Sequence, residues 1–109
     1  MKVVNSSNFE ESVIKFEGLV LVDFFAPWCG PCQGMLPVLE EISVKLPKNQ
    51  QIVKINVDDD QELAGKYGIM SIPAFKLFKN GKIIDEAVGA MNKEAVLALF
   101  AKHSDTSEK

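Results

Sequence analysis

The 109-residue chain contains no arginine, only two cysteines and a single histidine, tryptophan and tyrosine. All 12 basic residues are therefore lysines, and the formal net charge is −3. Nucleic-acid-binding proteins usually present a basic face and use arginine for bidentate contacts. Because neither feature is found, the composition argues against nucleic acid as a partner.

The chain also lacks any apolar run long enough to span a membrane. Its first residues, MKVVNSSNFEE, lack the apolar stretch and the small-residue cleavage site of a signal peptide. We therefore expect no membrane association and a cytoplasmic location, although a mature chain that has lost a leader would look the same. In the cytoplasm, two cysteines indicate redox or metal chemistry more often than a structural disulfide.

No repeat, low-complexity block or flexible linker interrupts the sequence. Its length, with 47% hydrophobic and 25% charged residues, is typical of one soluble globular domain with an adequate core. We predict a single domain over residues 1–109, of which 103–109 (HSDTSEK) form a polar C-terminal tail.

Hydrophobic spacing predicts an α/β fold with the element order β-α-β-α-β-α-β-β-α. Residues 19–25 are apolar on both alternating faces, which is typical of a strand buried between two layers of helices. Asn80-Gly81 is a strong signal for a two-residue hairpin turn. The expected sheet is therefore mixed, with three parallel strands, an antiparallel C-terminal hairpin and four flanking helices. The other expected elements are a strand at 3–4, a helix over 9–16, a helix after the cysteines kinked at Pro37, a strand at 51–58, a helix at 61–68, and a last helix capped by Asn92.

The two cysteines, Cys29 and Cys32, stand two residues apart in the stretch APWCGPCQGMLP. A zinc site normally needs four Cys or His ligands, and the chain offers only these two and His103 near its end, so we expect no metal. A structural disulfide across so short a loop would stabilise the fold by only about 2 kcal/mol. The C-x-x-C spacing inside a β-α-β pattern favours a third interpretation, dithiol–disulfide exchange.

The predicted position of the motif at a helix N-terminus fits that chemistry. The helix dipole and unpaired N–H groups stabilise a thiolate there, so Cys29 is the predicted nucleophile, with an exposed sulfur. Cys32 lies within the first turn and is the predicted buried resolving thiol. Pro31 restricts the flexibility of the link and Gly30 removes side-chain bulk, so both are expected to tune the redox reaction.

Asp23 interrupts the apolar strand six residues before Cys29. Burial of a carboxyl group raises its pKa, so Asp23 could accept the proton of Cys32 when that thiol attacks. The alternative is an aspartate that turns into solvent or caps a loop at the strand end. Lys54, in the middle of the strand at 51–58, either pairs with Asp23 or extends to solvent.

Several segments together resemble the thioredoxin family: VDFFAP followed by WCGPC, a proline five residues after the second cysteine, SIP before a strand, FKNG at a hairpin and VGA before the last helix. The resemblance extends from residue 3 to about 102 and implies the thioredoxin fold. It also implies the roles given above for Cys29, Cys32 and Asp23, with Lys54 near Asp23.

The resemblance further implies a flat apolar rim that receives an extended segment of the substrate. Trp28 would belong to this rim rather than to the core, and Met70 would either join it or fill a gap in the core. Ile72-Pro73 resembles the cis-proline pair that faces the active site in the family. The implied rim residues are Trp28, Ile72, Pro73, Gly89 and Ala90.

Four positions depart from the pattern of many relatives: Phe25, Gln33, Gly34 and Ser71. Gln33 removes a positive charge near the expected thiolate, and Gly34 weakens the first helical turn by up to about 1 kcal/mol. These departures affect potency and the choice of partner, and leave the type of reaction unchanged.

The resemblance implies an enzyme that reduces disulfides in proteins and is itself reduced by thioredoxin reductase, an NADPH-dependent flavoprotein. The chain has no Gly-rich dinucleotide fingerprint, so we expect it to hold no cofactor, and we expect a monomer. Two alternatives remain at this point. The chain could be a binding module whose redox centre is incidental, or it could use the same chemistry as an oxidant.

Overall fold

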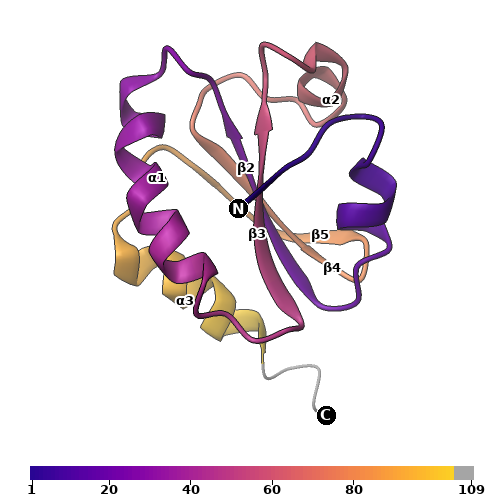
Figure 1. Ribbon diagram of the computed structural model, residues 1–109, viewed down its shortest axis with the longest axis vertical. Coiled ribbons are helices and arrows are strands. Elements are labelled where there is room, and N and C mark those ends of the chain that lie inside the picture. Colours follow the sequence, from indigo (N-terminus) through magenta and orange to yellow (C-terminus); the bar gives the residue numbers. More distant parts are fainter. Residues whose placement is uncertain (105–109) are drawn as a thin grey trace.

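The computed structural model describes residues 1–104 and shows a central sheet between two layers of helices (Figure 1). Helices α1 and α3 cover one face of the sheet, and η1 and α2 lie on the other (Figure 1). The elements are β1 (Lys2–Val3), η1 (Glu10–Ile14), β2 (Leu19–Phe25), α1 (Gly30–Ser43), β3 (Gln50–Asn56), α2 (Gln61–Lys66), β4 (Ala74–Lys79), β5 (Lys82–Val88) and α3 (Lys93–Ser104).

The five strands have the spatial order β1-β3-β2-β4-β5. β1 and β2 both pair with β3 in parallel, whereas β4 is antiparallel to β2 and to β5. The structure therefore confirms the α/β class, the mixed five-stranded sheet and the four helices.

Strand β2 lies at the centre of this sheet, and all seven of its residues are buried. Its alternating side chains divide between two cores. Val20, Val22 and Phe24 pack with residues of η1 and α2, while Leu19 and Leu21 pack against α1 and α3. Burial on both faces explains why this segment is apolar at almost every position.

The turns and caps follow the local sequence. Asn80 and Gly81 form the hairpin turn with φ angles of 49° and 86°, which an Asn-Gly pair adopts readily. Asn92 caps α3, because its Oδ1 accepts a hydrogen bond from Ala95 N at 2.9 Å. Pro37 lies inside α1, where its nitrogen cannot donate a helical hydrogen bond.

Some bounds differ from the prediction, since β1 ends at Val3, β3 at Asn56 and α2 at Lys66. Two further segments differ more. The first helix is shorter than residues 9–16 and is a π-helix, in which Lys15 N donates to Glu10 O at 2.9 Å. His103 and Ser104, expected in the polar tail, form the end of α3, where His103 Nε2 lies 2.8 Å from Asp85 Oδ2. This contact with β5 explains why the helix continues past residue 102; residues 105–109 of the expected tail lie outside the described residues.

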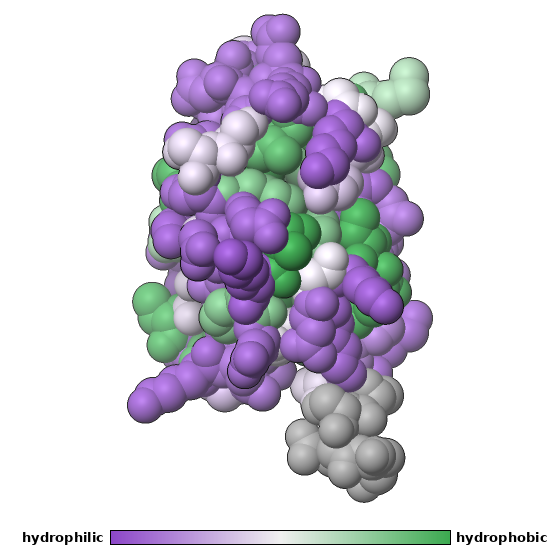
Figure 2. Space-filling model, turned by 90° about the vertical axis from the view of Figure 1, so that its right-hand side faces the viewer, coloured by the Kyte–Doolittle hydropathy of each residue, from purple (hydrophilic) through white to green (hydrophobic). Residues whose placement is uncertain are grey.

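The surface combines polar and apolar areas. Figure 2 views the molecule from the side of η1 and α2 and shows apolar side chains exposed in patches between polar ones. No helix within residues 1–104 is long and apolar enough to cross a membrane.

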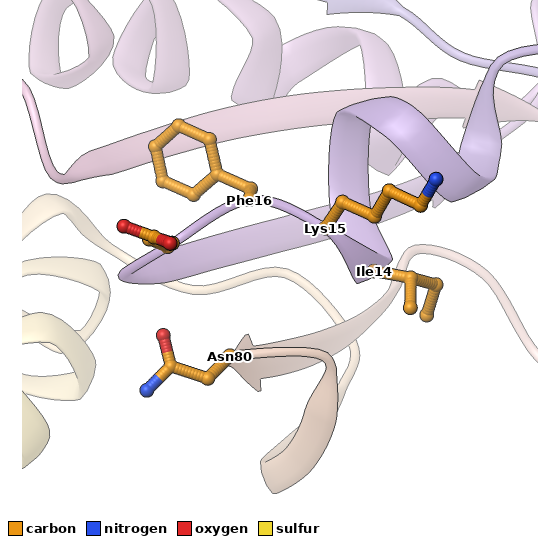
Figure 3. A pocket seen from close by; sticks show the side chains of 5 residues that line it. Ile14, Lys15, Phe16 and Asn80 are labelled. Carbon is orange, nitrogen blue, oxygen red and sulfur yellow. The ribbon is translucent and has the colours of Figure 1, made fainter.

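A hollow of about 440 Å³ opens near the amino end of β2 and is lined by Ile14, Lys15, Phe16, Glu17 and Asn80 (Figure 3). The cysteines follow the opposite end of β2. A seven-residue strand spans roughly 20 Å, so this hollow is remote from them.

Candidate active site

The two cysteines lie where the buried strand β2 gives way to α1. Cys29 is the N-cap residue of α1, and Cys32 lies in its first turn. The two form a disulfide with their Cα atoms 5.2 Å apart, and Cys32 N donates a hydrogen bond to Cys29 Sγ at 3.2 Å. The helix N-terminus thus places backbone N–H groups and the positive end of the helix dipole beside the sulfur of Cys29.

Cys29 was expected to be exposed, but the disulfide form buries it. Its exposed fraction is 5%, compared with 0% for Cys32. Phe25 and Ala26 pack with both cysteines, and the partly buried Ile72 covers this small cluster. The loop before β4 therefore covers Cys29 at the start of α1, which the sequence pattern did not predict.

That loop brings the Ile72-Pro73 pair to the disulfide. The peptide bond between them is cis, and the carbonyl oxygen of Ile72 lies 3.9 Å from Cys29 Sγ. Gly89, just after β5, donates its N–H to the carbonyl oxygen of Pro73 at 2.8 Å. Three of the predicted rim residues, Ile72, Pro73 and Gly89, are thus held together beside Cys29, and Ala90 follows them on the surface.

Trp28 lies on the surface rather than in the core, with 70% of its area exposed. Its indole Nε1 donates a hydrogen bond to Asp58 Oδ2 at 2.9 Å, which holds the ring beside Cys29 although solvent surrounds it. Asp58 was not among the predicted site residues. It belongs to a run of three aspartates, and nothing in the run distinguishes the one that reaches the tryptophan.

Asp23 is buried on the face of β2 that is turned toward α1, with an exposed fraction of 1%. Side chains of a strand alternate, so it lies between Leu21, which packs against α1, and Phe25, which packs with the cysteines. Neither of its carboxyl oxygens has a hydrogen-bond partner among the described residues. Burial raises the pKa of Asp23 from 3.8 to about 7, and the ammonium group of Lys54 opposes this rise.

Lys54 is the register partner of Asp23 across the β2–β3 pair, so the structure brings these two predicted residues together. It is half-buried, and its Nζ lies 5.4 Å from the centre of the Phe25 ring. The stem of the lysine thus runs along the sheet, and its charge lowers the pKa of Asp23 less than burial raises it.

Comparison with known proteins identifies the family to which the chain belongs. The chain matches the family model described as Thioredoxin over residues 1–102. It is 47% identical to a thioredoxin of Bacillus subtilis (strain 168) over 103 residues, which cover 94% of this chain and 99% of that protein. The chain belongs to the thioredoxin family. It is also 45% identical to a thioredoxin of Rickettsia bellii (strain RML369-C) over 94 residues, covering 86% and 90% of the two chains.

Membership of the thioredoxin family, together with the Cys29–Cys32 disulfide, makes the chain a thiol–disulfide oxidoreductase. Disulfide-containing proteins are the substrate class that the thioredoxin family implies. Within residues 1–104, no group of three or more His, Cys, Asp or Glu side chains could hold a metal ion. His103, the histidine weighed above as a zinc ligand, contacts Asp85.

Proposed function

We propose that this thioredoxin-family protein reduces disulfides in other proteins, with Cys29 as the nucleophile. In the dithiol form, the Cys29 thiolate attacks one sulfur of the substrate disulfide. A bond forms between Cys29 and that sulfur, the substrate S–S bond breaks, and the second substrate sulfur leaves as a thiolate.

Cys32 then resolves this mixed disulfide. Its thiol loses a proton and attacks Cys29 Sγ, which forms the disulfide that the structure contains and releases the second substrate thiolate. The substrate gains two electrons, and the dithiol of the chain loses them. Gly30 and Pro31 keep the two sulfurs within reach of each other and thereby tune the exchange.

Asp23 is the proposed acceptor of the Cys32 proton. To accept this proton the carboxyl group must be ionised, and with its pKa raised by burial to about 7 it is partly ionised near neutral pH. Its oxygens, unpaired within residues 1–104, leave it free to take up a proton. Lys54, on the neighbouring strand β3, lowers the pKa of this carboxyl group and so favours its ionised form.

The oxidised chain needs electrons to act again. We propose that thioredoxin reductase, an NADPH-dependent flavoprotein, supplies them, so that flavin and nicotinamide belong to that partner. The proposed rim of Trp28, Ile72, Pro73, Gly89 and Ala90 receives the segment around the substrate disulfide. We further propose that the chain acts as a monomer in the cytoplasm and forms one domain over residues 1–109.

The observation that supports this function best is the arrangement of three groups: a helix N-terminus holding Cys29, the adjacent Cys32, and a buried carboxyl group on the same side of the sheet. A structural disulfide would not need the third group, since an unpaired buried carboxyl only costs stability.

The Cys32→Ser variant tests the assignment of roles. Without the resolving thiol, the mixed disulfide at Cys29 cannot be resolved. The variant should therefore accumulate covalent complexes with protein substrates, and dithiothreitol should reduce these complexes. Cys29→Ser is the matched control and should trap none. Non-reducing electrophoresis and mass spectrometry identify the linked cysteine.

Two results would contradict the proposal. Trapping through Cys32 in the Cys29→Ser variant would reverse the roles. Partner binding that persists after both cysteines are replaced would identify a binding module. Equilibration with glutathione buffers measures the redox potential, and a value near those of oxidising disulfide-exchange proteins would make the chain an oxidant.

A further inference from the structure

The ammonium group of Lys54 lies over an aromatic ring and is not bonded to the carboxyl group opposite it. Its Nζ is 5.4 Å from the centre of the Phe25 ring, which is within the range of a cation–π interaction. Asp23 is the register partner of Lys54 on β2, yet neither of its oxygens has a hydrogen-bond partner within residues 1–104. The sequence left two positions open for this ammonium group, an ion pair with Asp23 or solvent, and the structure shows a third.

Phe25 has the position and the surroundings to hold this charge. It follows Asp23 by two residues on the same face of β2, so the ring and the carboxyl group are neighbours along the strand. The ring is only 8% exposed and packs with Cys29 and Cys32 in one small cluster. Close packing fixes the orientation of a ring, so the ammonium group meets an aromatic face that does not turn away.

The place of this ammonium group matters, because direct pairing would weaken Asp23 as a base. An opposite charge close to a carboxylate stabilises the ionised form and lowers its pKa by about 1–3. With the ammonium group over Phe25, the effect of burial is the larger one, and the pKa of Asp23 is about 7. The carboxyl group thus keeps the proton affinity that it needs to accept the proton of Cys32.

The other charges near this face of the sheet do not take over the role of Lys54. On β4 the register partner of Asp23 is Phe75, which carries no charge. Cys32 does not titrate while it is in the disulfide. The two helices that cover this face carry their charges at Glu40, Glu41, Lys93, Glu94, Lys102 and His103. The pKa of Asp23 responds to burial and to Lys54, and to none of these six side chains.

We propose that the ring of Phe25 holds the ammonium group of Lys54 away from the carboxyl group of Asp23 and so preserves that group as the acceptor of the Cys32 proton. Phe25 is then a positioning residue for the second step of disulfide exchange, and it acts through Lys54. This inference rests on the proposed function, since it concerns the base that the proposed resolution step uses.

The test measures the ionisation of Asp23 in the full oxidised chain, where the disulfide keeps both cysteines from titrating. NMR of ¹³C-labelled aspartate follows the carboxyl carbons between pH 4 and 10, and Asp23→Asn identifies the Asp23 signal. Phe25→Leu removes the ring and frees the ammonium group to approach the carboxylate, so the pKa of Asp23 should fall by at least about 1. Phe25→Trp restores an aromatic face and should keep this pKa within about 0.3 of the wild-type value.

A second background separates positioning from a general loosening of the site. Lys54→Met removes the charge, and adding Phe25→Leu to it should leave the pKa of Asp23 unchanged to within about 0.3, because the ring acts through the ammonium group. Water that enters beside a smaller side chain would instead lower the pKa with or without the lysine. Urea midpoints check that the variants are folded, and Phe25→Met replaces Phe25→Leu in both backgrounds if the leucine variant is not.

The reaction of the reduced chain with the symmetrical disulfide of thionitrobenzoate tests the base itself. Attack by Cys29 releases one coloured thiolate and forms a mixed disulfide, and attack by Cys32 on Cys29 releases the second. The second phase of colour in a stopped-flow experiment therefore reports the resolution step. In Asp23→Asn this phase should be at least about tenfold slower than in the wild type at pH 7.

The possible failures are distinguishable. A pKa of Asp23 that stays constant or rises in Phe25→Leu, that falls equally in the Lys54→Met background, or that falls as far in Phe25→Trp would overturn the inference and leave the proposed function intact. A second phase that is as fast in Asp23→Asn as in the wild type would overturn the proposed role of Asp23, and this inference with it.

Discussion

At the scale of single residues, the buried carboxyl group of Asp23 lowers the stability of the fold but serves the proposed chemistry. Its carboxyl group lies within the sheet without a hydrogen-bond partner in the described part of the chain, and its pKa rises from 3.8 to about 7. A rise of roughly 3 in pKa corresponds to about 4 kcal/mol of differential stabilisation between the two protonation states. An apolar residue would avoid this cost, but it could not accept the proton of Cys32.

The sign of the pH effect follows from linkage. Between pH 4 and 7 the folded chain keeps the Asp23 proton while the unfolded chain releases it, so the free energy of unfolding falls as the pH rises. We expect the stability of the wild type to fall by up to about 4 kcal/mol relative to Asp23→Asn between pH 4 and 8. Urea unfolding of the oxidised proteins across this range measures the difference, in which any pH-independent cost of the buried amide cancels. Parallel pH curves for the two proteins would contradict the raised pKa.

At the scale of elements, the sequence predicted what local patterns determine. The two-sided apolar run of β2, the Asn80-Gly81 turn and the Asn92 cap each act over a few residues, and all three are confirmed. The exceptions depend on contacts between distant segments. Cys29 is covered by the loop at Ile72, and His103 extends α3 through its contact with Asp85. The partner of Trp28 depended in the same way on the path of the chain after β3.

The hairpin turn gives a test at this scale. Gly81 has a φ of +86°, and a Cβ atom there would lie 2.7 Å from the carbonyl oxygen of Ile14. Gly81→Ala should therefore destabilise the fold by about 2 kcal/mol, from backbone strain and from the contact with the last residue of η1. Gly65→Ala is the control, since Gly65 lies in α2 with open space around it, and alanine there should stabilise by about 0.5–1 kcal/mol. Urea unfolding compares the variants, and equal effects of the two substitutions would contradict this account.

At the scale of the whole molecule, the crossover topology brings the site together at one end of the sheet. β2 and β3 run parallel, so Phe25, which precedes the cysteines, is in register with Asn56, which precedes Asp58. The antiparallel β4 begins at this same end, which places Ile72 and Pro73 opposite the start of α1. The redox site is therefore assembled from three loops that are far apart in the sequence.

The side chain of Asp60 connects two segments that are far apart in the sequence. Asp60 caps α2 through its Oδ1, which accepts from Leu63 N at 3.0 Å. Its Oδ2 accepts from both the backbone N–H and the hydroxyl of Ser6, at 2.6 and 2.7 Å. One carboxylate thus joins the segment after β1 to the helix that follows β3, and the hydrogen bonds from Ser6 and Leu63 hold its pKa below 3.8.

Asp60→Ala removes both connections and should lower the stability at pH 7 by about 2 kcal/mol, from the lost cap and the lost hydrogen bonds to a charged group. Asp59→Ala is the control, because Asp59 is the exposed neighbour and should change the stability by less than about 0.5 kcal/mol. A carboxylate with a lowered pKa stabilises the fold above its unfolded pKa and loses this effect as the pH falls, so the cost of Asp60→Ala should shrink below pH 4. Urea unfolding at pH 7 and pH 3 measures both effects. A cost equal to that of Asp59→Ala at pH 7, or one that grows in acid, would show that the Ser6–Asp60 link does not hold these two segments together.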